Sequence, residues 1–297
     1  MPSPQSIALV GCGAWGKHIL RDLVGLGCHV SVVARSEASI MRAREGGAHE
    51  IVSSMEALTS PDGVVVAVPT AVHAEVLESV LGLGVPVFVE KPLTNDPVTA
   101  RRFELRDDLF IMDKWRYHPG VEMLRDCVID RRFGGMRGMQ TVRHGLYNGH
   151  SDVDAIWILV PHDLSIILEV VGELPAPVGA VGHVVGDDAN LIAILEGGFG
   201  LDVSSRSNVH RREVRVWFEN AVVTLSDAYS DALDVRTTVA GQEPVASQLP
   251  LGSRLPLEAE LDAFLGYLRG GPPPRSSAAE GALIVERVQQ LRDFAGV

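Results

Sequence analysis

The sequence predicts a two-domain α/β protein. Residues 1–116 are expected to form a doubly wound parallel sheet, and residues 117–297 an α+β domain with a large, open, mostly antiparallel sheet. In the first half, apolar runs rich in β-branched residues alternate with helix-like segments, which is the pattern of βαβ units. In the second half, strand-like runs follow one another closely and are joined by Gly, Asn and Asp, as in antiparallel sheets. A chain of 297 residues is long enough for two such domains.

Apolar runs bounded by turn residues locate the elements of the first half. In chain order we expect strands at residues 7–10, 30–34, 64–68, 85–89 and 109–112, and helices at 17–26, 37–45, 71–83 and 97–105. The run at 64–68 is apolar throughout, which fits a parallel strand that is buried on both faces. Doubly wound sheets of this Rossmann type bind ligands at the carboxyl ends of their strands, so we expect functional residues there.

The second half combines helices with strands that alternate in polarity. We expect helices at residues 120–130, 155–171, 256–269 and 278–294, and strands at 136–144, 178–185, 189–195, 200–205, 211–219, 221–226 and 233–239. An open sheet of this size leaves one face to be covered, often by another subunit. We therefore expect a homodimer or homotetramer formed through this sheet.

The composition favours a globular protein that acts on a small molecule. Hydrophobic residues make up 46% of the chain and charged residues 22%. No run approaches the ~18 apolar residues of a membrane span, and the first residues do not resemble a signal peptide, so we expect a cytoplasmic protein. Three cysteines without paired spacing argue against a disulfide framework or a metal site. A net charge of -12 disfavours binding to nucleic acid.

The most informative motif is a glycine loop between the first strand and the first helix. Gly11, Gly13 and Gly16 follow the spacing G-x-G-x-x-G, with Ala14 and Trp15 between the last two. In such loops the first glycine allows a tight turn, the second lets the backbone approach a pyrophosphate, and the third lets the helix pack closely. Strands precede and follow the motif, so we expect a bound dinucleotide rather than a glycine-rich turn without a ligand.

The end of the second strand indicates which dinucleotide binds. NAD-selective folds place a carboxylate at this point to hold the ribose 2′-hydroxyl, whereas this chain has Ala34, Arg35 and Ser36. Ala34 leaves room for a 2′-phosphate, and Arg35 and Ser36 offer a charge and a hydroxyl to bind it. We expect a preference for NADP(H), with NAD(H) possible. The alternative is that Arg35 stacks on adenine or faces solvent, and the nearby Glu37 keeps that alternative open.

Three further segments, together with the glycine loop, resemble the Gfo/Idh/MocA family, named after glucose-fructose oxidoreductase, inositol dehydrogenase and rhizopine catabolism. They are residues 66–74, with Val68, Pro69, Thr70 and His73; residues 89–94, with Glu90, Lys91 and Pro92; and residues 157–165, around His162. The resemblance runs over nearly the whole chain. It implies that the first two segments contact the cofactor and that the third carries the catalytic histidine.

The chemistry implied by this resemblance is hydride transfer between a nicotinamide and a carbinol or carbonyl carbon. His162 would carry the hydroxyl proton, since an unperturbed imidazole titrates near ~6.5. Lys91 would hydrogen-bond the reacting oxygen and the nicotinamide ribose, and Pro92 can adopt a cis bond that aims the lysine. The alternatives are a structural histidine and an ordinary surface lysine.

The sequence departs from the family at one position. Family members usually carry an aspartate one helical turn before the histidine, and this chain has Ile158 there. Three explanations stay open: the substrate lacks the usual hydroxyl, another acid (Asp113, Asp152 or Asp154) takes over, or redox catalysis has been lost. Asp163 is a poor substitute, because adjacent helix residues point about 100° apart.

Polar residues near these segments are candidates for a hydroxyl-binding substrate pocket. They are Lys114, Arg116, Tyr117 and His118, followed later by Arg143, Tyr147, Asn148, His150 and Asp152. The sequence therefore favours an NADP(H)-dependent ketoreductase or dehydrogenase acting on a sugar, a cyclitol or a related polyhydroxylated carbonyl. An imine (C=N) reductase of the same fold and a non-catalytic NADP-binding sensor are the alternatives.

Overall fold

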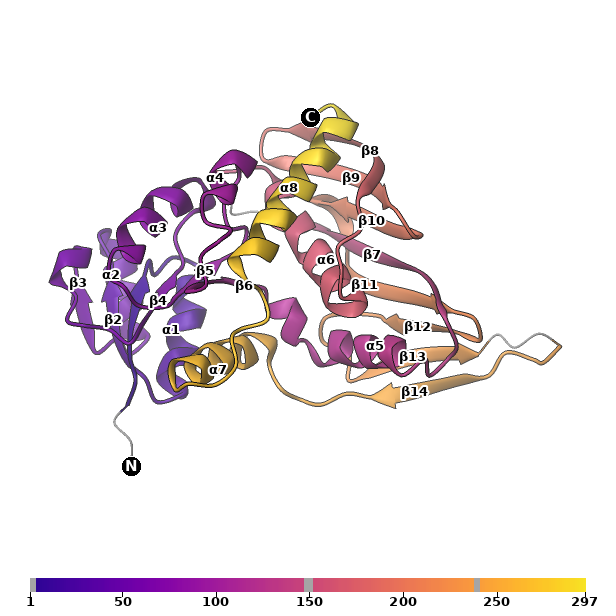
Figure 1. The fold of residues 1–297 in the computed structure, drawn as a ribbon, viewed down its shortest axis with the longest axis horizontal. Coiled ribbons are helices and arrows are strands. Elements are labelled where there is room, and N and C mark those ends of the chain that lie inside the picture. The colour runs from indigo at the N-terminus through magenta and orange to yellow at the C-terminus, as the bar shows by residue number, and fades with distance from the viewer. Residues whose placement is uncertain (1–3, 147–151, 238–240) are drawn as a thin grey trace. The chain divides into compact units, whose positions relative to one another are not determined.

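The computed structural model describes residues 4–146, 152–237 and 241–297 and divides into two compact units (Figure 1). Unit 1 comprises Met1–Lys114 and Leu257–Val285, and unit 2 comprises Trp115–Pro256 and Glu286–Val297. The sequence analysis expected a single boundary between residues 116 and 117. The structure instead returns the chain to unit 1 after the second sheet is complete.

The described part of unit 1 is built on a six-stranded parallel sheet. Its strands are β1 (Ser6–Val10), β2 (His29–Val33), β3 (Glu50–Val52), β4 (Gly63–Val66), β5 (Val87–Glu90) and β6 (Leu109–Met112), in the order β3-β2-β1-β4-β5-β6. The strand order reverses between β1 and β4, and doubly wound sheets bind their ligands at this switch point. The expected doubly wound sheet is confirmed. Only β3 was not expected, because three residues carry no periodic signal.

The helices of unit 1 begin and end within about two residues of the expected positions, except α4, which ends at Arg101 rather than at residue 105. They are α1 (Gly16–Gly25), α2 (Glu37–Glu45), α3 (His73–Leu81), α4 (Pro97–Arg101), α7 (Pro256–Leu268) and the first part of α8 (Ala278–Ala295), with short 3-10 turns η1 (Met55–Ala57) and η2 (Thr70–Val72). Ser36 and Asp96 cap α2 and α4 by accepting hydrogen bonds from backbone N–H groups.

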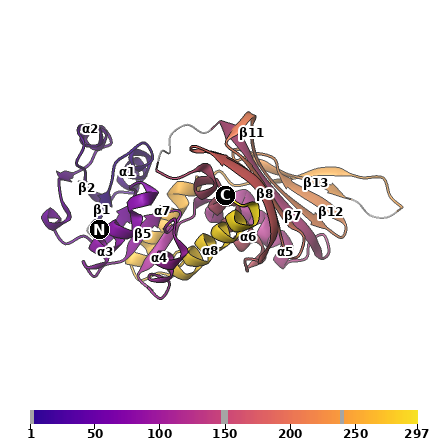
Figure 2. The ribbon, with the colours of Figure 1, turned by 90° about the horizontal axis from the view of Figure 1, so that it is seen from above.

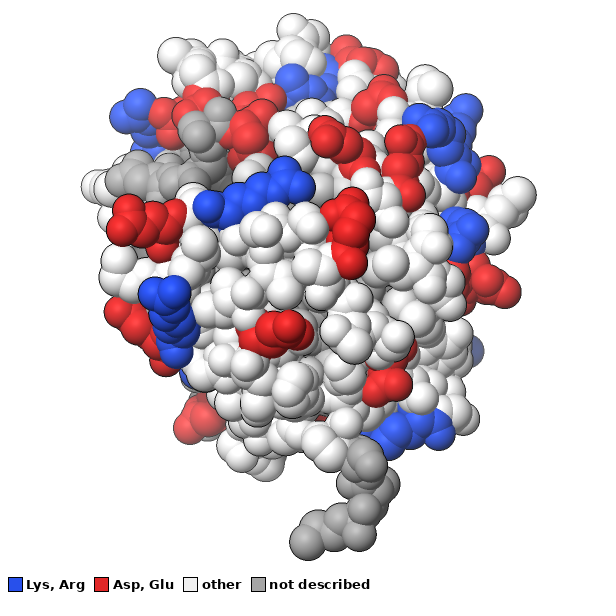
Figure 3. Space-filling model, turned by 90° about the vertical axis from the view of Figure 1, so that its left-hand side faces the viewer, with Lys and Arg blue, Asp and Glu red and all other residues white. Residues whose placement is uncertain are grey.

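The face of the molecule drawn in Figure 3 carries acidic and basic side chains interspersed with one another.

Packing of α7 explains why residues 257–285 belong to unit 1 rather than to the second domain. Its apolar positions recur at helical spacing and join the core of the parallel sheet. Phe264 stacks on Phe88 of β5 with ring centroids 5.0 Å apart, and Tyr267 meets Phe110 of β6 edge-on at 4.9 Å. This burial against strands early in the chain outweighs sequence proximity to the second sheet.

The described part of unit 2 contains an eight-stranded sheet. Its strands are β7 (Met136–Leu146), β8 (Pro177–Val185), β9 (Asp188–Leu195), β10 (Phe199–Ser204), β11 (Arg206–Phe218), β12 (Ala221–Leu225), β13 (Ala232–Thr237) and β14 (Ala246–Pro250). The order is β14-β13-β12-β11-β7-β10-β9-β8, with antiparallel pairs except for β7 and β10. The mostly antiparallel sheet is confirmed, whereas β14 was not expected from the sequence.

Two helices of unit 2, α5 (Pro119–Ile129) and α6 (Ala155–Val171), lie on one face of this sheet (Figure 2). Helix α6 is apolar around nearly its whole circumference and is buried along its length. On the opposite face Val181, Ile192 and Ile194 are 68%, 55% and 58% exposed. None of the helices in the described ranges is both long and apolar enough to cross a membrane.

Candidate functional site

The glycine loop of unit 1 has the geometry of a pyrophosphate cradle. Gly11 has φ +94°, and a Cβ there would lie 2.5 Å from the Ala67 carbonyl oxygen. A Cβ at Gly16 would lie 2.6 Å from the Gly11 carbonyl oxygen, whereas one at Gly13 would meet no atom within 4 Å. Gly11 and Gly16 are therefore required by close packing, and Gly13 leaves its backbone open to a ligand. The start of α1 adds N–H groups and has no acidic residue in its first turn, so the site fits a dinucleotide.

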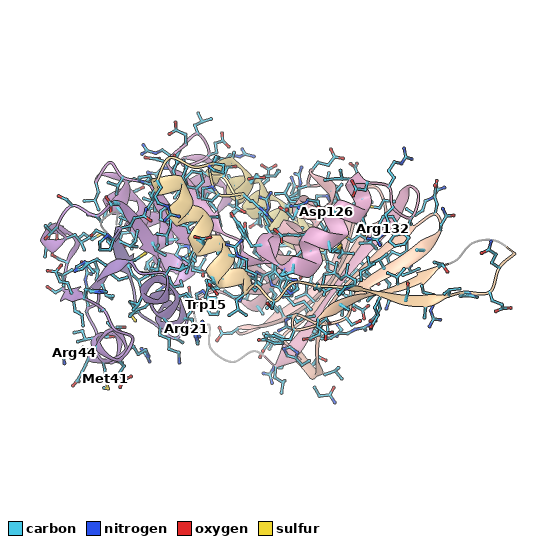
Figure 4. The ribbon with its side chains drawn as sticks, turned by 90° about the horizontal axis from the view of Figure 1, so that it is seen from below. Trp15, Arg21, Met41, Arg44, Asp126 and Arg132 are labelled. Carbon is cyan, nitrogen blue, oxygen red and sulfur yellow. The ribbon has the colours of Figure 1, made fainter. Side chains whose placement is uncertain are left out.

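Trp15 links this loop to the ends of β5 and β6. Its indole N–H donates a hydrogen bond to the Glu90 carboxylate, and the Lys114 Nζ lies 4.1 Å from the centroid of its ring. Glu90 also accepts the backbone N–H of Lys91 at 3.2 Å. Figure 4 labels Trp15 at the start of α1. The structure thus brings together Trp15, Glu90, Lys91 and Lys114, four of the residues singled out in the sequence.

His73 joins the loops that follow β4 and β5. It is fully buried, with Nδ1 2.8 Å from the Pro92 carbonyl oxygen and Nε2 3.0 Å from the Val68 carbonyl oxygen. Burial lowers the pKa of His73, which the two carbonyls oppose. The Lys91–Pro92 peptide bond is cis, as expected. In the same region Pro69 is exposed and Thr70 is buried. His73 therefore holds the backbone that carries Lys91 and Val68.

The end of β2 presents a hydroxyl and a guanidinium beside a small side chain. Ala34 is buried, and a hollow of about 490 Å³ borders it. Arg35 is exposed and its Nε donates to the Ser53 carbonyl oxygen at 3.4 Å. Ser36 is the N-cap of α2 and accepts the Ser39 N–H at 3.2 Å. The first turn of α2, which follows directly, carries Glu37.

In unit 2, helix α6 carries His162, whose side chain is partly exposed. Ile158 lies one turn earlier on the same helix and is 7% exposed. Asp154, one of the acids considered as a replacement, is the N-cap of α6: its Oδ1 accepts the Ile156 N–H at 3.0 Å. Its Oδ2 lies 2.8 Å from Arg292 Nη1. Both oxygens of Asp154 are therefore engaged in anchoring the helix.

Next to His162 lies a buried ion pair that sequence reasoning missed. Arg143 of β7 donates from Nε and Nη2 to Asp163 at 2.9 and 3.0 Å, and both residues are at most 3% exposed. The Arg143 guanidinium also lies 4.8 Å from the Trp115 ring centroid. Burial raises the pKa of Asp163, and Arg143 opposes that shift. The pair fixes the turn of α6 that carries His162. The sequence feature that could have indicated this pair is Asp163, the acid next to His162.

The other polar candidates of unit 2 have structural contacts. Arg116 is 8% exposed and its Nε donates to Glu169 of α6 at 2.9 Å. His118 is buried and caps α5 by accepting the Gly120 N–H at 3.0 Å. Asp152 is half-buried. Tyr147, Asn148 and His150 lie outside the described residues. In the described ranges no three His, Cys, Asp or Glu side chains are grouped so that they could hold a metal ion.

Comparison with known proteins identifies the family. Residues 5–104 match the Gfo/Idh/MocA family model, described as an oxidoreductase family with an NAD-binding Rossmann fold. Residues 5–104 of this chain belong to the Gfo/Idh/MocA family. The match covers the strands and loops that carry Gly11 to Gly16 and the Glu90-Lys91-Pro92 motif. Family membership confirms the expected oxidoreductase class and nicotinamide cofactor.

Several family members act on sugars or cyclitols, according to their names. UDP-N-acetylglucosamine 3-dehydrogenase of Acidithiobacillus ferrooxidans is 27% identical over 252 residues, which is 79% of each chain. Its solved structure aligns with a TM-score of 0.83 over 98% of this chain and 97% of that one, at 24% identity. Myo-inositol dehydrogenase Hyg17 of Streptomyces leeuwenhoekii is 29% identical over 47% of this chain and 46% of its own length. Levoglucosan dehydrogenase, solved with NADH and levoglucosan, shares the fold with a TM-score of 0.85, covering 99% of this chain and 98% of that one, at 14% identity.

Proposed function

We propose that this chain is an NADP(H)-dependent dehydrogenase or ketoreductase of a sugar, a cyclitol or a related polyhydroxylated carbonyl compound. The observation that carries the proposal is the cradle at Gly13 beside the Glu90-Lys91-Pro92 strand end, to which Trp15 is tied. The names of the relatives support the substrate class, since those enzymes act on a nucleotide sugar, an inositol and an anhydrosugar.

Each candidate residue has a separate role in such a reaction. The nicotinamide supplies or accepts the hydride. Lys91 donates a hydrogen bond to the reacting oxygen and stabilises the charge that develops there. His162 takes the hydroxyl proton in oxidation and returns it in reduction. The Arg143–Asp163 pair holds the turn of α6 on which His162 stands.

The preference for NADP(H) is supported by the end of β2. Arg35 and the N-terminus of α2 together offer the donors that a 2′-phosphate needs, and Ala34 leaves space for it. Fluorescence titration with NADPH and NADH tests this preference directly. Tighter binding of NADH would contradict it.

A panel of substrates tests the reaction itself. We expect NADPH consumption with keto-sugars or ketocyclitols, or NADP⁺ reduction with the matching alcohols. Reduction of cyclic imines is the second candidate activity, favoured by the buried, apolar Ile158 one turn before His162, since an imine substrate needs no neighbouring hydroxyl. Binding of the dinucleotide without turnover in either panel would instead favour the sensor.

We also propose that two or four copies of the chain associate through the open face of the eight-stranded sheet. Val181, Ile192 and Ile194 of β8 and β9 share this face, because Val181 pairs with Ile192 in the sheet and Ile194 lies two residues further along β9. Each is more than half exposed in the single chain. A second copy that covers them removes apolar surface from water.

A further inference from the structure

Helix α7 carries one acidic side chain on the face that packs against the sheet. Leu257, Leu261 and Phe264 of this face belong to the core of unit 1, and Glu260 lies among them, three residues after Leu257 and four before Phe264. Glu260 is 1% exposed, and neither of its carboxylate oxygens forms a hydrogen bond with any described residue. An ionised carboxylate is strongly disfavoured in such a position.

The register of α7 on β5 places Glu260 near the carboxyl end of that strand. Phe264 stacks on Phe88, and Glu90 shares the face of Phe88 because alternate strand residues point the same way. Glu260 lies one helical turn, about 5.4 Å, before Phe264 along α7. Glu90 lies about 6.6 Å beyond Phe88 along β5. With Phe264 stacked on Phe88, these similar distances bring Glu260 to the level of Glu90. The charged groups that act on Glu260 are accordingly Glu90 of β5, with Asp113 and Lys114 just after β6.

Of the two glutamates, Glu260 is the one that keeps a proton. Glu90 accepts hydrogen bonds from the Trp15 indole and from the Lys91 backbone. Burial raises the pKa of Glu90, but Lys91, the Trp15 indole and Lys114 all oppose that shift and favour its ionised form. Glu260 has no such donors in the described structure. Burial raises the pKa of Glu260 well above its ordinary value; Glu90 and Asp113 raise it further and Lys114 opposes them.

We propose that Glu260 is a positioning residue whose neutral form lets the ionised Glu90 hold Trp15 and so fix the glycine loop for dinucleotide binding. When Glu260 loses its proton, the new carboxylate repels Glu90 and attracts Lys114. Trp15 then loses its hydrogen bond to Glu90 and its contact with the Lys114 ammonium. A negative charge is also added near the cradle for an anionic pyrophosphate, so the affinity for the dinucleotide falls as pH rises.

The first test needs no cofactor, because the indole N–H of Trp15 reports its bond to Glu90. In the ¹⁵N-labelled full chain, with Trp15→Phe used to assign the resonance, we expect this signal to shift on the alkaline side of a titration between about pH 5 and pH 10. Glu260→Gln imitates the neutral acid and should keep the low-pH position throughout. Glu258→Gln, an exposed glutamate on the same helix, is the matched control and should titrate like wild type.

A signal that does not move in wild type, or that titrates alike in wild type and Glu260→Gln, would overturn the proposal. If Glu260→Gln does not fold, as judged by near-ultraviolet circular dichroism, Glu260→Met replaces it as an apolar side chain of similar length. The same outcomes then apply to that variant.

The second test measures the NADPH dissociation constant over the same pH series and rests on the proposed function. For wild type and Glu258→Gln we expect the Kd for NADPH to rise about tenfold as pH rises through the titration. A tenfold rise corresponds to a difference of about one pKa unit for Glu260 between the free and the NADPH-bound protein. For Glu260→Gln we expect less than about a twofold rise. If no variant binds NADPH, the proposed function fails and the indole signal still decides the role of Glu260.

Discussion

At the residue scale, the proposed chemistry depends on two side chains, Lys91 and His162. Lys91 supplies an ammonium group, on a backbone segment that His73 ties to the segment of Val68, whereas His162 supplies an imidazole. The Ile158 side chain carries no charged or hydrogen-bonding group, so in the proposed reaction His162 moves the proton without the usual carboxylate one turn away. The side chain at position 162 therefore has the largest expected effect on turnover.

Replacing His162 with Asn is expected to lower kcat by about 10²- to 10⁴-fold, because the proton carrier is lost while the volume is nearly kept. The NADPH dissociation constant should change little. Steady-state rates and fluorescence titration measure the two quantities separately. His29→Asn, at an exposed histidine of β2, is the control. Wild-type turnover by the His162 variant would remove His162 from the mechanism.

Arg35→Ala is expected to weaken NADPH binding by about 10- to 100-fold, since a charge-assisted hydrogen bond contributes about 1.5–3 kcal/mol. NADH has no 2′-phosphate, so its dissociation constant should stay within about twofold. Arg102→Ala removes an exposed arginine that pairs with Glu78 and serves as the control. Equal losses for both dinucleotides would show that Arg35 stacks on adenine instead.

Among the elements, the range of α6 follows from the local sequence, but one of its buried ion pairs does not. Its range, Ala155–Val171, was predicted correctly, as were those of α2 and β6, because hydrophobic periodicity and caps are local properties. The short β3 and the edge strand β14 were missed, because neither carries enough alternating apolar residues to stand out. The Arg143–Asp163 pair was also missed, because it joins a strand and a helix twenty residues apart.

Arg143→Met is expected to destabilise the protein by about 3–5 kcal/mol, because it leaves the buried Asp163 carboxylate without its cation. Arg137→Met, on the same strand, breaks an exposed pair with Glu219 and should cost less than about 1 kcal/mol. Urea unfolding of the two variants provides the comparison. A similar, small loss in both would mean that Asp163 is held by other groups.

On the scale of the whole molecule, the open face of the eight-stranded sheet exposes apolar side chains to water. Its apolar side chains are concentrated on β8 and β9, while polar pairs such as His144–Asp202 occupy the central strands. An interface on this face would combine the apolar side chains of β8 and β9 with polar contacts on the central strands. Association would also cover the edge strand β8.

Ile192→Lys is expected to convert a dimer or tetramer into monomers, because a buried ammonium at the interface would be left without a partner. Light scattering after size-exclusion chromatography measures the mass of each form. Leu105→Lys, at a 92% exposed leucine of unit 1, should leave the assembly unchanged. A monomeric wild type at micromolar concentration would contradict the proposed association.

The sequence by itself determined the cofactor loop, the ends of the strands and the family, because glycine spacing, strand periodicity and the Glu90-Lys91-Pro92 motif are local constraints on the backbone. Only the tertiary structure decided that α7 belongs to the first unit, that Glu260 is buried in the core of that unit, and that Arg143 pairs with Asp163. These facts depend on which distant segments share a core, and desolvation of a charge is set by that packing rather than by its neighbours in sequence.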